Sequence, residues 1–143
     1  MTIAGVLLAA GEGSRFNGST HKLQAVLDGE PIFVHAARAM IGAGFNQIVV
    51  VTGAADLTAE IALLESETGR SITVAHNPAW ATGQASSLRA GLAVLGATGC
   101  TAAVVGLGDQ PRVGIAAWRT VGASRGTIVS AVFEGKRRPP VKL

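Results

Sequence analysis

Residues 7–22 read LLAAGEGSRFNGSTHK, an apolar run followed by a segment with glycines and basic side chains. This order is typical of a buried strand that turns into a loop. Gly11 and Gly13 let the backbone turn tightly and approach a ligand closely, so that successive N–H groups can point at one anion. Arg15 and Lys22 would add full positive charges there. The segment therefore predicts a loop that binds phosphate.

Two well-known phosphate-binding patterns do not describe this loop. Gly13 and Gly18 have the spacing of a Walker A loop, but Ser19 stands where that loop requires lysine. A dinucleotide-binding fingerprint that starts at Gly11 has Phe16 in place of its third glycine. The predicted phosphate loop is therefore of another kind.

The rest of the chain alternates apolar runs of strand length with longer helical patterns. This alternation predicts an α/β fold, in which helices flank a mostly parallel sheet. A length of 143 residues and an apolar fraction of 48% fit a single domain that spans residues 1–143. We expect strands at 5–10, 47–52, 71–76, 101–107 and 127–133, and helices at 31–42, 55–68 and 85–95.

The composition limits the classes of partner. The net charge is only +3, and the basic residues are spread out apart from residues 136–138, which we expect to form a solvated charge run. A small anionic substrate is favoured over nucleic acid, which usually requires a basic stripe with interleaved aromatic residues. The lone Cys100 allows no disulfide framework and favours a reducing, cytoplasmic location. No window reaches the length of a membrane span, so we expect no membrane partner.

A carboxylate follows the apolar run at 101–107. Ligands of open α/β sheets bind beyond the carboxyl ends of the strands, where the loops after these strands should converge. Asp109 lies in one of those loops. Mg²⁺ prefers one or two carboxylates together with phosphate oxygens, which makes Asp109 a candidate metal ligand. The alternative is a solvated turn aspartate, since an Asp shortly before a proline such as Pro111 is common in turns.

Three segments resemble, in the same order, motifs of known nucleotidyltransferases. Leu8-Ala9-Ala10-Gly11, with Arg15 and Lys22 after it, is similar to the signature of nucleotidyltransferases of the GT-A-like α/β fold. Residues 77–92, NPAWATGQASSLRAGL, resemble a block of the molybdenum cofactor cytidylyltransferase (MobA-like) group, and Gly108-Asp109-Gln110-Pro111 resembles its metal motif. The resemblance implies a three-layer, Rossmann-like sandwich of the nucleotide-diphospho-sugar transferase type.

The activity that this resemblance implies is the transfer of CMP from CTP to a phosphorylated acceptor of molybdopterin type, with release of pyrophosphate. Alanine at position 10 favours a pyrimidine, because the related guanylyltransferases commonly have Leu-Ala-Gly-Gly there. Arg15 and Lys22 would hold phosphates, and Asp109 would ligate Mg²⁺. Ser87 would lie near the base. The nucleotide-binding set that we expect is Leu8, Ala9, Ala10, Gly11, Gly13, Arg15, Lys22, Gly53 and Ser87.

Departures from the family pattern leave alternatives open. The interval between Arg15 and Lys22 is longer than in the family, and His21 is the histidine that we expect nearest the phosphates. Relatives continue beyond the segment that ends here at Leu143, so we expect the domain to lack C-terminal elements. A sugar- or alcohol-phosphate nucleotidyltransferase and a non-catalytic nucleotide-binding remnant are the alternatives.

Overall fold

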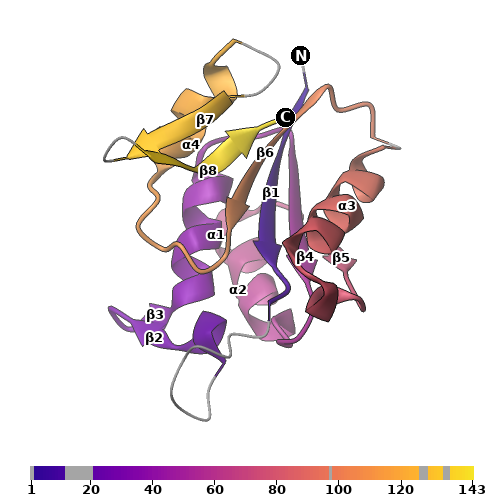
Figure 1. The fold of residues 1–143 in the computed structure, drawn as a ribbon. Coiled ribbons are helices and arrows are strands. Elements are labelled where there is room, and N and C mark those ends of the chain that lie inside the picture. Colours follow the sequence, from indigo (N-terminus) through magenta and orange to yellow (C-terminus); the bar gives the residue numbers. More distant parts are fainter. Residues whose placement is uncertain (1, 12–20, 97, 126–128, 134–135) are drawn as a thin grey trace.

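The computed structural model describes residues 2–11, 21–96, 98–125, 129–133 and 136–143. Within this part of the chain the main feature is a six-stranded sheet with the order β5-β4-β1-β6-β8-β7 (Figure 1). Neighbouring strands run parallel from β5 to β6, whereas β8 is antiparallel to both β6 and β7. The strands are β1 (Ile3–Ala9), β4 (Gln47–Thr52), β5 (Thr73–His76), β6 (Ala102–Leu107), β7 (Val129–Phe133) and β8 (Lys136–Lys142).

Helices lie on both faces of the sheet (Figure 1). One face is covered by α1 (Ile32–Gly42), α2 (Thr58–Thr68) and α4 (Ile115–Ala123), which share a single buried apolar cluster. On the other face, α3 (Gln84–Leu95) packs on β1, β4 and β5. None of the described helices is long and apolar enough to cross a bilayer.

The central strands are apolar throughout because both of their faces are buried. In β1, Leu7 and Ala9 belong to the cluster beneath α1 and α2, whereas Ala4 and Val6 belong to the cluster beneath α3. The neighbouring strand β4 alternates in the same way. This alternation fixes the face of the sheet to which each side chain of β1 points. It thereby also sets the direction in which the chain leaves the strand after Ala9.

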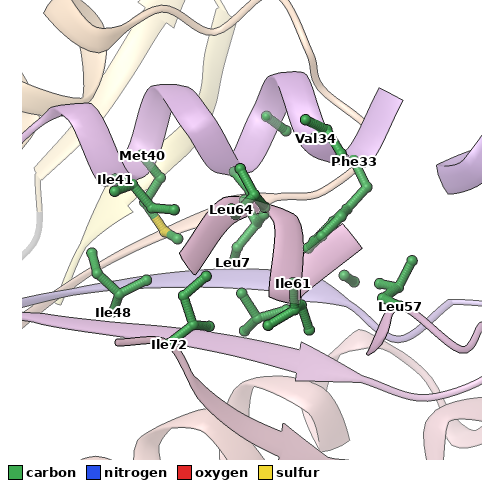
Figure 2. Packing of buried hydrophobic residues seen from close by; sticks show 14 of the residues in the cluster. Leu7, Phe33, Val34, Met40, Ile41, Ile48, Leu57, Ile61, Leu64 and Ile72 are labelled. Carbon is green, nitrogen blue, oxygen red and sulfur yellow. The ribbon is translucent and has the colours of Figure 1, made fainter. Parts of the chain in front are cut away.

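The larger core lies between the sheet and the pair α1 and α2 (Figure 2). Phe33 and Met40 of α1 and Leu64 of α2 are fully buried there, over Leu7 and Ile48 of the sheet. Burying side chains of this size contributes about 1.5–3 kcal/mol each. This core holds the strand ends rigidly, which is what a site built on the following loops requires.

Where α4 packs on the sheet, this core requires a glycine in β6. A Cβ atom at Gly106 in β6 would lie 2.4 Å from the ring of Trp118 in α4. Trp118 is therefore accommodated only because position 106 has no side chain. The same indole meets Phe45 edge to face, with ring centroids 6.1 Å apart, which fixes α4 against the start of β4.

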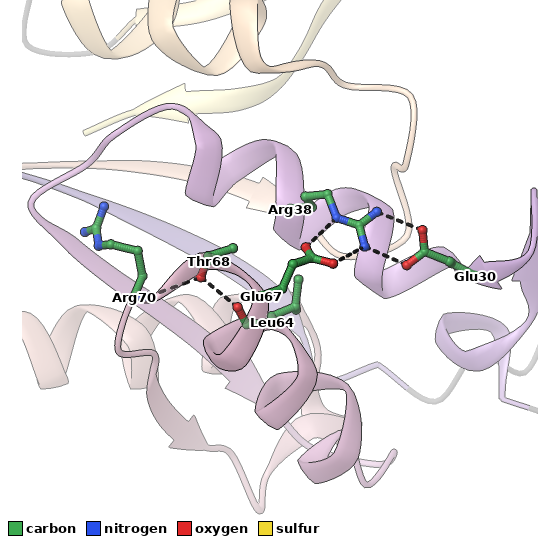
Figure 3. A network of polar contacts seen from close by, with 6 residues as sticks. All are labelled: Glu30, Arg38, Leu64, Glu67, Thr68 and Arg70. Atoms are coloured by element: carbon green, nitrogen blue, oxygen red, sulfur yellow. Dashed lines mark hydrogen bonds and ion pairs between the residues drawn. The ribbon is translucent and has the colours of Figure 1, made fainter.

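A surface ion network links the short hairpin of β2 (Val26–Leu27) and β3 (Glu30–Pro31) to α1 and α2 (Figure 3). The Arg38 guanidinium donates to both carboxylate oxygens of Glu30, at 2.9 and 2.6 Å, and to both of Glu67, at 2.7 and 2.9 Å. Its hydrogen bonds lower the pKa of Glu30 and of Glu67, and the two carboxylates raise the pKa of Arg38. In the same view, the Thr68 hydroxyl donates to the Leu64 carbonyl near the end of α2.

The structure confirms the α/β class, the five expected strands and the three expected helices, with ends that differ by up to three residues. The expected solvated run at 136–138 lies at the start of β8, and the side chains of Lys136 and Arg137 are exposed, as expected. The β2–β3 hairpin and the strand β8 were not expected. Only two residues pair in each hairpin strand, which is too short for a visible pattern in the sequence.

Candidate active site

The carboxyl ends of the parallel strands meet at one edge of the sheet and are joined there by backbone hydrogen bonds. The Gly108 N–H, after β6, donates to the Leu8 carbonyl of β1 at 2.9 Å. The Ala54 N–H, after β4, donates to the Ala10 carbonyl at 3.1 Å. The loop after β1 is thus held between the loops after its two neighbouring strands, which fixes its backbone at the place where ligands bind in such sheets.

A small cavity of about 100 Å³ opens at this edge. It contains the end of β1, the start of α3, and the two charged side chains of Lys22 and Asp109. Its lining residues are Leu8, Ala9, Gly11, His21, Lys22, Leu23, Gln84, Leu107 and Asp109. The structure therefore brings together five of the residues expected at the site, from three separate segments of the chain: Leu8, Ala9, Gly11, Lys22 and Asp109.

Lys22 and Asp109 form an ion pair, with 3.3 Å between Nζ and Oδ2. Both side chains are about 40% exposed, at 38% and 40%, so the pair is screened and open to exchange of partners. Lys22 begins a short 3₁₀ helix, Lys22–Gln24, whose Leu23 is buried in the core. Although the interval between Arg15 and Lys22 is longer than in the family, the Lys22 ammonium lies next to the carboxylate of Asp109, which follows β6.

His21 occupies the space between the end of β1 and this 3₁₀ helix. Its Nε2 lies 2.7 Å from the Gly11 carbonyl oxygen, and its Nδ1 accepts a hydrogen bond from the Leu23 N–H at 3.1 Å. A backbone N–H can only donate, so Nδ1 carries no proton and Nε2 carries the one that is donated to Gly11. His21 contacts backbone on both sides, and both contacts lie beside the cavity.

Gly53 lies next to this cavity but does not line it. A Cβ atom at position 53 would come within 2.5 Å of the Ala10 carbonyl oxygen and 2.8 Å of the Cβ of Trp80. The glycine is therefore needed for the close approach of the β1 and β4 loops. Gly53 instead lines a larger hollow of about 450 Å³ between β5 and α2, which contains neither Lys22 nor Asp109. The larger hollow therefore lacks the charged side chains expected at the site, and the smaller cavity contains them.

Ser87 is buried in a polar network under the start of α3. The Asn77 side-chain amide donates to the Ser86 hydroxyl at 2.9 Å and to the Ser87 hydroxyl at 3.0 Å. Asn77 is itself buried, and its side-chain oxygen accepts from the Ala79 N–H. The network joins the loop after β5 to α3, and Ser87 does not reach the cavity of Lys22 and Asp109. Its expected role near the base stays a prediction.

The expectations for Gly13 and Arg15 lie outside the described residues. Ala10 is described and is 3% exposed, with its carbonyl occupied by Ala54. Leu8, Ala9 and Gly11 line the cavity and Ala10 does not, and the binding of phosphate by this backbone stays a prediction.

Gln84 was missed by the sequence reasoning. It is the first residue of α3 and lines the same cavity as Lys22 and Asp109. Helix α3 begins without a side-chain cap, so the partial positive charge of its first N–H groups faces this edge of the sheet. The break at Gly83 before an amphipathic segment was the signal for a helix start there.

The donor set fits a divalent cation of the kind that is shared with phosphates. Among the described residues no three His, Cys, Asp or Glu side chains cluster as a complete metal cage. The one carboxylate lining the cavity is that of Asp109. Mg²⁺ and Mn²⁺ are commonly held by one or two carboxylates, with substrate phosphate oxygens and water as the other ligands. Asp109 can supply the protein's part of such a site.

A parallel sheet with helices on both faces, and with a cationic and an anionic side chain in the loops beyond its strand ends, is the arrangement of an α/β protein with a ligand site at that edge. The chain belongs to the family of the MobA-like NTP transferase domain, whose model matches residues 5–143. It is a nucleotidyltransferase, with a nucleoside triphosphate and a phosphorylated acceptor as the substrates that this domain implies.

Solved structures share this fold. A nucleotidyl transferase from Methanothermobacter thermautotrophicus has 25% identity and a TM-score of 0.79, over 99% of this chain and 70% of that one. Rv0371c of Mycobacterium tuberculosis, solved in complex with manganese, has 24% identity and a TM-score of 0.72 over the same shares. The inositol-1-phosphate CTP transferase of T. maritima has 18% identity and a TM-score of 0.60, over 76% of this chain and 44% of that one. No curated protein matches the chain.

Proposed function

We propose that this protein transfers CMP from CTP to a phosphorylated acceptor of molybdopterin type and releases pyrophosphate. The observation that carries the proposal is the Lys22–Asp109 pair, 3.3 Å apart, beside the backbone of Leu8, Ala9 and Gly11. Phosphate oxygens would replace the carboxylate as the partner of Lys22. Asp109 would then be free to bind a cation, with Mg²⁺ as the ion that we propose.

The choice of CTP and of the acceptor is supported by sequence motifs. Alanine at position 10 is the residue expected for a pyrimidine nucleotide, and residues 77–92 resemble the block of the cofactor cytidylyltransferases. Ser87 and Gly53 are proposed to lie on the side of the base, next to the cavity. Sugar-phosphate nucleotidyltransferases share the alanine, so transfer to a sugar or alcohol phosphate is the second candidate.

In the proposed reaction an acceptor phosphate oxygen forms a bond to the α-phosphorus of CTP, while the bond from that phosphorus to the bridging oxygen of pyrophosphate breaks. Lys22, together with Arg15, would hold the phosphates in line and offset their negative charge. The cation held by Asp109 would neutralise further charge on the phosphates. A phosphate acceptor is already ionised near neutral pH, so no residue is needed as general base.

The test measures pyrophosphate release with each of the four nucleoside triphosphates, Mg²⁺, and molybdopterin, glucose 1-phosphate or inositol 1-phosphate as acceptor. We expect turnover with CTP and molybdopterin. Turnover with UTP and a sugar phosphate would contradict the proposed acceptor, and CTP binding without turnover would favour a binding protein.

Asp109→Asn should abolish the Mg²⁺-dependent rate, with a loss of at least about 100-fold, because the amide cannot supply the negative charge. Asp28→Asn is the matched control. Asp28 lies in the exposed turn between β2 and β3, with a φ of 50° that asparagine tolerates equally well. An unchanged rate in Asp109→Asn would refute the metal assignment.

A further inference from the structure

His21 holds two separately anchored parts of the site together, and it does so next to Lys22. Gly11 follows β1, and the preceding Ala10 carbonyl is bonded to Ala54 after β4. On the other side Leu23 is 4% exposed and anchors the 3₁₀ helix in the core. The imidazole bonds to Gly11 and to Leu23 and so bridges these two anchored points.

This bridge lies across the segment that contains the interval between Arg15 and Lys22, which is longer than in the family pattern. In sequence, residues 12–20 connect Gly11 to His21, so the bond from Nε2 to the Gly11 carbonyl joins the two ends of that connection. Lys22 lies between His21 and the buried Leu23. Its backbone is therefore fixed on both sides, and its ammonium group faces Asp109.

We propose that His21 is a positioning residue, which sets Lys22 and the Gly11 backbone at the spacing that triphosphate binding requires. The inference rests on the proposed function and assigns this side chain a part in it. The imidazole acts through Gly11 and Lys22 and does not itself take part in the transfer.

The chemistry of the ring explains why histidine suits this position. One edge must accept from the Leu23 N–H while the other must donate to the Gly11 carbonyl, and a neutral imidazole with its proton on Nε2 does both on a rigid frame. Asparagine places an oxygen where Nδ1 lies and can keep the Leu23 contact, as a good N-cap residue does. Glutamine can place an amide N–H near the position of Nε2, but it does not provide that cap.

The two amide variants therefore separate the two contacts. The experiment measures the dissociation constants of CTP and of inorganic tripolyphosphate by calorimetry in the presence of Mg²⁺. Tripolyphosphate has no base or sugar, so it reports on the phosphate part of the site. We expect His21→Asn to weaken both ligands about tenfold, as the loss of one well-placed hydrogen bond predicts, and His21→Gln to recover most of that loss. The loss in His21→Asn should appear in KM more than in kcat.

His35→Asn is the matched control. His35 also bonds a backbone carbonyl, that of Leu27, but it lies on α1, away from the cavity. We expect its ligand affinities to equal those of the unaltered protein. Nitrogen NMR of the imidazoles gives a readout that does not depend on activity, and it should show His21 protonated at Nε2 and unprotonated at Nδ1.

The possible results separate this inference from the proposed function. Failure of the unaltered protein to bind either ligand would contradict the proposed function and, with it, the role of His21. Binding by the unaltered protein with equal affinity in His21→Asn would overturn the positioning role alone. Equal loss of affinity in His21→Asn and His21→Gln would show that the contact with Gly11 is not the cause of the loss. A proton on Nδ1 of His21 would contradict the same contact.

Discussion

Gly53 shows how a residue without a side chain can shape the site. Its Cα lies where any Cβ would meet the Ala10 carbonyl oxygen at 2.5 Å, and that carbonyl is fixed by the Ala54 N–H. The neighbouring contact is with backbone, which does not move aside as a flexible side chain does. The strand ends of β1 and β4 therefore come as close as they do because of this glycine.

Gly53→Ala should accordingly damage binding and stability together. We expect a loss of about 1–3 kcal/mol in the free energy of unfolding, the usual cost of overpacking, and weaker CTP binding because the Ala10–Gly11 backbone must shift. Urea denaturation and calorimetry measure the two effects. Gly96→Ala is the control, since that position has a helical φ of −56° and its nearest contact is 3.5 Å away. If Gly53→Ala keeps the stability and the CTP affinity of the unaltered protein, the loop after β1 can shift without cost and the glycine is not required.

Individual site residues were predictable where a local pattern exposed them. Asp109 stood out because it follows an apolar strand, and Lys22 because it is a basic residue that follows the glycines after another apolar run. The 3.3 Å contact between them joins residues 87 positions apart, which no local pattern reports. The position of Ser87 inside the Asn77 network was also invisible, because serine and asparagine are common both in loops and in buried networks.

At the scale of elements, β8 is the strand that sequence patterns miss. It reads KRRPPVK, with three basic residues at its start and two prolines, neither of which is typical of a strand inside a sheet. The pairing with β7 shifts register between Ser130, opposite Val141, and Ala131, opposite Arg138. The two prolines fall within this irregularity, where missing N–H donors cost little.

The end of β8 is attached to α4 by a buried lysine. Lys142 is 6% exposed, and its ammonium donates to the Ser124 carbonyl at 2.8 Å and to the Gly122 carbonyl at 3.2 Å. These carbonyls lie at the carboxyl end of α4, where a cation also offsets the helix dipole. The side chain thus connects a strand and a helix that the chain itself joins only through β7.

Lys142→Met should loosen this connection while it preserves most of the packing. We expect a loss of about 1–2 kcal/mol in the free energy of unfolding, because two carbonyls lose a charged donor. Urea denaturation measures the loss. Lys136→Met is the control, since Lys136 lies on the same strand and is exposed. Equal stability of the two variants would mean that the cost of burying the ammonium cancels its two hydrogen bonds.

At the scale of the whole molecule, stability should depend on pH through the carboxylates of Glu30 and Glu67. Hydrogen bonds from Arg38 hold the pKa of each below its ordinary value of 4.5. A lowered pKa in the folded state means that the stabilising contribution is present above about pH 4.5 and is lost as the pH falls through the folded-state value. Asp56, whose pKa is lowered by its hydrogen bonds from Thr58, adds to the same trend.

Arg38→Met should therefore destabilise the protein at pH 7, and its difference from the unaltered protein should shrink below pH 4.5. The measurement is the urea midpoint at a series of pH values between 7 and 3. Arg119→Met provides the comparison, because Arg119 donates to the Gly42 carbonyl and forms no ion pair with a carboxylate of the described residues. A difference for Arg38→Met that stays constant with pH would contradict the assignment of the stabilisation to the ion network.

The fold class was predictable because it follows from local periodicity, repeated along most of the chain. Continuous apolar runs such as 47–52 predicted strands buried on both faces, and helices between them predicted parallel pairing. The order of the strands was not accessible in the same way. The placement of β8 between β6 and β7 depends on pairing between residues far apart, such as Val104 and Lys142.

That strand order has a consequence for how the chain reaches its native state. β7 is made before β8, yet within the described residues it joins the sheet only through β8, and β6 gains its second neighbour only then. On a ribosome, β6 would therefore present an open edge until residues 136–142 had emerged. Pairing over such sequence distances is slow, and open strand edges invite association with other chains. We therefore expect the interval before β8 docks to be the stage at which nascent chains are most exposed to aggregation.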